Sequence, residues 1–262
     1  MKNSEINNFL INLKNDTVFD LFINKASFLL FLHGYKTITL EYINIQYYYQ
    51  VKSFFNNYNH LFSYKISKLD NKEFIIIFSK DVDLLSEFKK IFDEYLNGKN
   101  ENILEIGNLL GFPGCCVESF YNFFKNYTFN EIPDYMYNYF KVILGNSNII
   151  DKRLDIFSNR LITHTPCSFS CQKSLNTYNL SVKILNLYGF VDLILDIGTN
   201  YIFFKNNNYI KIDNNLLNKS YGVYYGKNKY SDIFFRKIIH KIDKKEILNY
   251  ENIPNTLYIK FH

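Results

Sequence analysis

Four cysteines are the residues of this chain with the clearest potential for chemistry. They occur as two tight pairs, Cys115 next to Cys116 and Cys167 four residues before Cys171, and the chain has no others. Thiolates are ligands for zinc and for iron, and two separated cysteine pairs are a frequent source of four ligands for one metal. The spacing therefore predicts that all four thiols converge on a single metal centre.

A proline lies shortly before each pair, at Pro113 and Pro166. Proline is favoured at the first position of a helix, so both pairs are expected in the first turns of helices, with Thr165 as the N-cap of the second. The free N–H groups and positive dipole of a helix start lower a thiol pKa and favour the thiolate. The apolar spacing that follows predicts that Cys167 and Cys171 share the buried face of one helix.

The type of metal is open at this point. Neighbouring side chains on a helix diverge by about 100°, so the pair Cys115 and Cys116 favours an iron–sulfur cluster, of 4Fe-4S type, over one zinc ion. The alternatives are a zinc-stabilised binding module and a metal-free thiol redox protein, besides four unrelated core thiols. A radical-SAM signature is excluded because its third cysteine would fall at Ser174. Whether the protein is an enzyme stays undecided.

Further polar residues flank the cysteines. His164 lies three residues before Cys167 and is a candidate ligand, catalytic proton donor or hydrogen-bond partner of a ligand. Glu118 is a candidate catalytic acid or base, although an acidic residue in a first helical turn also suits the helix dipole. The remaining candidates would bind an anionic substrate: Asn159, Arg160 and Lys173.

The two cysteine segments resemble the hallmark segments of a prokaryotic family, domain of unknown function 483. Residues 111–120 read GFPGCCVESF and residues 164–174 read HTPCSFSCQKS. The family pattern is Gly-aromatic-Pro-x-Cys-Cys followed by His-x-Pro-Cys-Ser-x-x-Cys. The resemblance covers 21 of 262 residues and implies no activity. It implies that His164 and Ser168 belong to one site with the four cysteines.

The elements that must position this site indicate an α+β fold, with mixed α/β as the alternative. Two parts are expected, an N-terminal α/β region over 1–98 and a second part over 99–262, which joins a helical cysteine-bearing segment to a strand-rich end. Helices are predicted over 8–14, 19–32, 42–57, 82–95 and 233–240. Strands are predicted over 62–67, 74–78, 191–197, 201–205, 209–212, 221–225 and 257–261, the fourth and fifth as a hairpin.

Composition limits the remaining function classes. The net charge is +5, but the lysines are scattered, so a solvated surface is expected and nucleic acid is not indicated. The run from Ala26 to Leu32 is far shorter than the ~20 residues of a membrane span. No signal peptide is evident, so we expect a cytoplasmic protein with reduced thiols and an unknown small molecule or redox protein as its partner.

Overall fold

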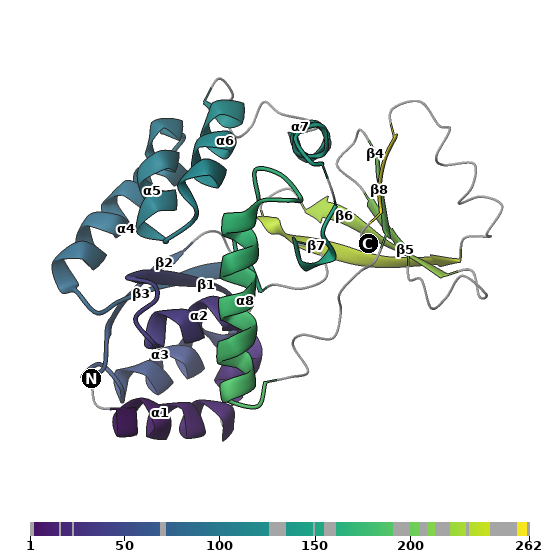
Figure 1. Ribbon diagram of the computed structural model, residues 1–262. Coiled ribbons are helices and arrows are strands. Elements are labelled where there is room, and N and C mark those ends of the chain that lie inside the picture. The colour runs from purple at the N-terminus through teal and green to yellow at the C-terminus, as the bar shows by residue number, and fades with distance from the viewer. Residues whose placement is uncertain are drawn as a thin grey trace.

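The computed structural model describes residues 3–15, 17–22, 24–68, 72–125, 135–148, 150–154 and 161–190, together with five strands in the last third of the chain. The α+β class is confirmed, because the chain combines helices with two sheets whose strands all pair antiparallel (Figure 1). The strand expected over 191–197 and the candidates Asn159 and Arg160 lie outside the described residues.

The first part of the molecule, here called the N-terminal unit (residues 3–96), is a three-stranded sheet covered by helices on both faces. Its strands are β1 (Ile38–Asn44), β2 (Ser63–Lys68) and β3 (Glu73–Ser79), in the antiparallel order β1-β3-β2. Its helices are α1 (Asn3–Asn15), α2 (Lys25–Leu32), α3 (Tyr48–Asn56) and α4 (Val82–Leu96), with 3₁₀ turns at Thr17–Leu21 and Ile45–Tyr47.

The central strand β3 explains why the sheet needs both layers. Its residues alternate in direction, and all five from Phe74 to Phe78 are buried. Phe74, Ile76 and Phe78 join the core formed with α1, α2 and α3, whereas Ile75 and Ile77 join a second core with α4. A strand that is buried on both faces reads as a continuous apolar run, which is the pattern that predicted it.

Two helix predictions in the N-terminal unit need correction. The range 42–57 was expected to be one helix, but Tyr42 to Asn44 complete β1 and the helix begins only at Tyr48. The range 19–32 is also interrupted, since a 3₁₀ turn ends at Leu21 and α2 begins at Lys25. In β1 the core-facing positions include Thr39 and Glu41, so the alternation of apolar and polar residues that announces a strand is missing.

The cysteines lie in the segment that follows the N-terminal unit. This segment contains α5 (Ile103–Leu109), α6 (Gly114–Phe124), α7 (Tyr135–Gly145) and α8 (Gln172–Leu187), with 3₁₀ turns at Asn100–Asn102 and Lys152–Leu154. Helix α5 packs against α4 and α6, and α8 packs against α2. Both apolar cores contain residues from each side of the expected boundary at residue 98, which stays a prediction.

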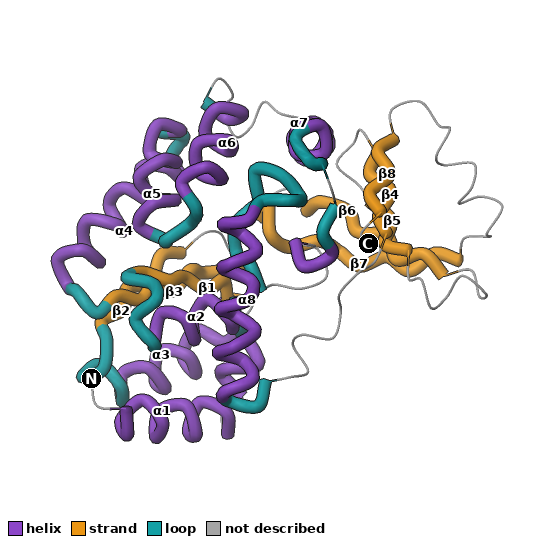
Figure 2. Tube along the Cα trace, viewed as in Figure 1, coloured by secondary structure: helices purple, strands orange, loops and turns teal. Residues whose placement is uncertain are grey.

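The last third of the chain contributes a five-stranded antiparallel sheet of order β7-β6-β5-β4-β8. Figure 2 shows these strands on the opposite side of α8 from the three-stranded sheet. The predicted hairpin is confirmed as β4 and β5, but residues 233–240 belong to a strand and not to a helix. The strands are β4 (Asn200–Phe204), β5 (Tyr209–Ile212), β6 (Tyr221–Asn228), β7 (Ser231–Lys241) and β8 (Thr256–Lys260).

Candidate metal centre

The first cysteine loop (residues 110–116) connects α5 to α6 by a glycine-dependent turn. Gly111 has a φ of 70°, its N–H donates to the Asn108 carbonyl, and the Phe112 N–H donates to the Gly107 carbonyl at 3.0 Å. These two bonds form a Schellman C-cap, which ends α5 and turns the chain sharply. Helix α6 then begins at Gly114, so the first pair lies in its first turn as expected.

The second cysteine loop (residues 161–171) forms neither helix nor strand. Helix α8 begins at Gln172 and Cys171 is its N-cap residue, so the expectation of a helix starting at Thr165 is wrong. Cys167 lies in the loop, half-buried, and does not share a helical face with Cys171. The loop is held from outside, because Ser147 Oγ accepts the Phe169 N–H at 2.7 Å and the Phe169 carbonyl accepts the Asp151 N–H at 2.9 Å.

The structure brings the four thiols together. Cys115 Sγ lies 3.9 Å from Cys116 Sγ and 3.8 Å from Cys171 Sγ, and Cys116 Sγ lies 3.7 Å from Cys171 Sγ. With Cys167 included, all four sulfur atoms lie within 4.8 Å of one another. The expectation that the sulfurs of the adjacent pair are held apart by the helix is wrong. Four clustered thiols of this kind can bind a metal ion.

Hydrogen-bond donors surround the most buried sulfur of the cluster. The backbone N–H of Cys167 donates to Cys116 Sγ at 3.4 Å, and Ser174 Oγ lies 3.3 Å from the same sulfur. Donors of this kind stabilise negative charge on sulfur. The second cysteine loop and the first turn of α8 therefore both support Cys116, which belongs to α6.

The thiols differ in how readily they ionise. Burial raises the pKa of Cys116, and it raises the pKa of Cys167 to about 12. Burial also opposes ionisation of Cys171, but hydrogen bonds from Ser174, Cys167 and Cys116 outweigh it and lower that pKa to about 7. A thiolate therefore forms more readily at Cys171 than at Cys116 or Cys167. Ionising all four requires a cation among them, since like charges this close repel strongly.

His164 is buried behind the sulfur cluster. Its Nε2 lies 2.8 Å from Ser174 Oγ, and Ser174 in turn contacts Cys116. Burial, helped by the charge of Lys36, lowers the pKa of His164 to about 3, so the ring is neutral at physiological pH. The histidine therefore lies one hydroxyl group away from the nearest sulfur and supports a ligand instead of joining the ligands.

The candidates outside the cluster occupy different places. Glu118 lies on the exposed face of α6, and Lys173 is exposed in the first turn of α8. Ser168 Oγ lies 3.3 Å from Ser170 Oγ within the second cysteine loop. Among the described residues, the four cysteines form the only group of three or more metal-binding side chains, and neither Glu118 nor His164 joins it.

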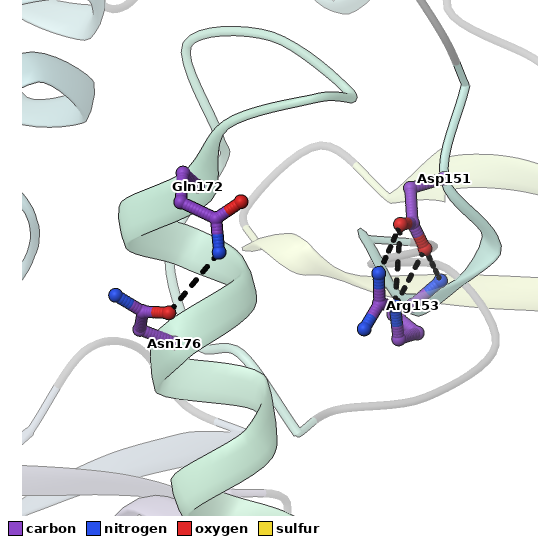
Figure 3. Close-up of polar contacts among 4 residues, drawn as sticks. All are labelled: Asp151, Arg153, Gln172 and Asn176. Carbon is purple, nitrogen blue, oxygen red and sulfur yellow. Dashed lines mark hydrogen bonds and ion pairs between the residues drawn. The ribbon is translucent and has the colours of Figure 1, made fainter.

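Figure 3 shows polar contacts within α8 and within the segment that contains Asp151. On α8, the Gln172 side chain donates to Asn176 Oδ1 at 3.2 Å. On the neighbouring segment, the Arg153 guanidinium makes a forked contact with Asp151, with its Nε 2.9 Å from Asp151 Oδ1. Because Asp151 also bonds the loop through its backbone, this ion pair rigidifies one support of the site.

Sequence reasoning missed several residues around the sulfurs. In the sequence, Ser174 served only to exclude the radical-SAM signature. Its position three residues after Cys171 places its hydroxyl group one helical turn away, beside Cys116 and His164. Tyr139 was not singled out; burial raises its pKa, and negative charge on Cys116 or Cys167 raises it further. Tyr139 is buried on α7, and the sequence gives no signal that this helix lies close enough to the cysteines for their charge to act on it.

Comparison with known proteins adds no relative: no family model, no curated protein and no solved structure matches the chain. Along the described residues, none of the helices combines the length and apolar character that crossing a membrane requires. The functional argument therefore rests on the geometry of the cysteines.

Proposed function

We propose that this protein is a zinc-stabilised binding module, in which one zinc ion bound by Cys115, Cys116, Cys167 and Cys171 fixes the two cysteine loops. The separation of the sulfur atoms carries this proposal. Four thiolates placed 2.3 Å from one ion at the corners of a tetrahedron are about 3.8 Å apart. The separations among Cys115, Cys116 and Cys171, 3.7, 3.8 and 3.9 Å, agree with that edge.

The same separations bear on the choice between zinc and the predicted 4Fe-4S cluster. The thiolates of a four-iron cluster bind different iron atoms and surround a larger inorganic core, so they lie farther apart than four thiolates on one ion. A maximum of 4.8 Å among the sulfurs therefore favours a single ion. The cluster stays a prediction that metal analysis tests, as does membership of the family that the cysteine segments resemble.

The ligand set favours a structural role over a catalytic one. Four cysteines complete a tetrahedral shell, whereas catalytic zinc keeps one position for water or substrate. The ion would join the first turn of α6, the second cysteine loop and the N-cap of α8. The loop itself contains no helix or strand. The binding surface of such a module would be the helices and strands that the ion holds in place.

Anaerobic purification followed by metal and sulfide analysis tests the identity of the metal. We expect a colourless protein with one zinc per chain and no sulfide. Replacement of the ion by cobalt should give the visible bands of tetrahedral cobalt and the intense near-ultraviolet bands of cobalt–thiolate bonds. A brown protein with iron matched by sulfide would contradict the zinc proposal and restore the cluster prediction.

Single cysteine-to-serine variants test whether the shell is closed. We expect each of the four variants to lose most of its bound zinc, because each removes one of four equivalent ligands. Ser170→Ala is the matched control, since it alters the second cysteine loop without touching a sulfur. If one cysteine proves dispensable for zinc binding while the other three are required, the shell is open and a structural role is wrong.

A further inference from the structure

Lys36 is a buried lysine between the N-terminal unit and the metal centre. It follows the C-cap of α2, where Gly34 has a φ of 80° and the Tyr35 N–H donates to the Leu30 carbonyl at 2.9 Å. This turn directs the lysine inward, and only 7% of it is exposed. A buried ammonium group is costly unless polar groups compensate it, so its partners must account for its position.

The N-terminal unit supplies the first partners of the ammonium group. Lys36 Nζ donates to Ser27 Oγ of α2 at 2.9 Å, and Ser27 Oγ lies 2.9 Å from Thr39 Oγ1 of β1. The carboxylate of Glu41, also on β1, interacts favourably with the lysine charge. These contacts fix the ammonium group firmly to the sheet and to α2.

The remaining partners belong to the two cysteine loops. Lys36 Nζ donates to Thr163 Oγ1 at 3.3 Å, four residues before Cys167. It also lies 5.0 Å from the ring centroid of Phe112, three residues before Cys115, which is within cation–π distance. The Phe112 ring in turn contacts the His164 ring, with 5.3 Å between their centroids.

The geometry points to Lys36 as a positioning residue that ties both cysteine loops to the N-terminal unit, so that metal binding depends on this one side chain. The inference rests on the proposed metal centre and adds what preorganises it. Because one ammonium group contacts both loops, its loss would let the two cysteine pairs move independently. A site that must be assembled during binding releases its metal faster than a preorganised one.

Metal release from Lys36→Met tests the inference. Lys80→Met is the matched control: Lys80 Nζ likewise donates a hydrogen bond, to the Leu32 carbonyl at 2.9 Å, and lies 5.5 Å from the Phe31 ring, but none of these partners belongs to a cysteine loop. Both zinc-loaded variants and the wild type are mixed with excess chelator well below their melting temperatures. We expect release at least about tenfold faster from Lys36→Met and within about twofold of wild type from Lys80→Met.

The spectrum of the cobalt-substituted protein supplies a readout that a general loss of stability does not move. At a temperature where each variant is folded, the tetrahedral cobalt bands should shift or broaden in Lys36→Met and stay unchanged in Lys80→Met. Equal release rates and equal spectra for the two variants would overturn the inference. A wild type without bound metal would instead contradict the proposed function.

Milder variants keep the test decisive if Lys36→Met does not fold. Thr163→Val removes the hydrogen bond to the second cysteine loop, and Phe112→Leu removes the ring of the first loop that contacts both Lys36 and His164. Each should accelerate metal release severalfold. Because the loss of either tie already separates the two loops, the double variant should accelerate release by less than the product of the two single effects. Unchanged rates in both single variants would contradict the inference.

Discussion

The N-terminal unit and the two cysteine loops are stabilised by different forces. In the N-terminal unit, the ring of Phe78 contacts those of Phe28, Phe55 and Phe62, with centroids 4.9–5.5 Å apart, and all four side chains are buried. The second cysteine loop also buries apolar side chains, among them Phe169, but it has no helix or strand, and single hydrogen bonds such as that from the Phe169 N–H to Ser147 Oγ hold its backbone. Dense aromatic packing stabilises the first region on its own, whereas the proposed metal would supply part of the stability of the second.

Removal of the metal should have the largest effect, and it should be local. When a chelator withdraws the ion, we expect the amides of Cys167, Phe169 and Cys171 to lose hydrogen-exchange protection by on the order of a hundredfold or more. The amides of β3, in the centre of the N-terminal unit, should keep theirs. Hydrogen exchange measured by mass spectrometry before and after chelation compares the two regions directly. An equal loss of hydrogen-exchange protection in both regions would show that the N-terminal unit also depends on the metal.

Truncation of the aromatic core should have the opposite effect: it should lower the stability of the N-terminal unit and leave metal binding intact. Phe78→Ala removes a fully buried ring and should lower the free energy of unfolding by about 3–5 kcal/mol. Below its melting temperature the variant should still bind one metal per chain. Chemical denaturation and metal analysis measure the two quantities. Tyr49→Ala is the control, because Tyr49 is 83% exposed and its loss should change stability by less than about 0.5 kcal/mol.

The charge of Lys36 should make the boundary between the two regions sensitive to alkaline pH. Burial lowers the pKa of Lys36 from 10.5 to about 8, although Glu41 opposes the shift. Between these two values the unfolded chain binds more protons than the folded one, so the lysine makes the free energy of unfolding rise with pH, by at most about 3 kcal/mol over the whole window. Below pH 8 it contributes no slope.

Denaturation of the metal-loaded wild type and of Lys36→Met over pH 7–10 measures this contribution. The difference between the two proteins cancels the titration of groups that both contain. We expect that difference to be flat up to about pH 8 and then to rise in favour of the wild type. A difference that stays flat up to pH 10 would mean that Lys36 is not buried as a charged group.

The sequence predicted those elements whose pattern is local. Phe74 to Phe78 form a buried strand because apolar residues are needed on both of its faces, and Val82 to Leu96 form a helix with an apolar stripe. Residues 233–240 were predicted as a helix because their own sequence carries no sign that they pair with β6. Long-range pairing decides such segments, and local patterns do not report it.

The candidate site likewise has some features that local sequence predicts and others that only long-range contacts determine. The pairing of the cysteines in the sequence indicated that they converge, because two short segments carry all four. The course of the second cysteine loop was not predictable, since Ser147 and Asp151, which hold it, lie at least 18 residues before Phe169 in the chain. Lys36 is still more remote, and only the folded chain brings it to Thr163.

Helix α8 gives the metal centre a mechanical connection to the rest of the molecule. Its 16 residues form a rod of about 24 Å, with Cys171 at one end. At the other end, the Tyr188 ring contacts His33 and the Phe190 ring contacts Phe19, both in the N-terminal unit. With the proposed metal bound, a pulling force along this rod would load the metal–sulfur bonds at one end, aromatic packing at the other and the packing of α8 against α2 between them, so the site would resist force together with the core.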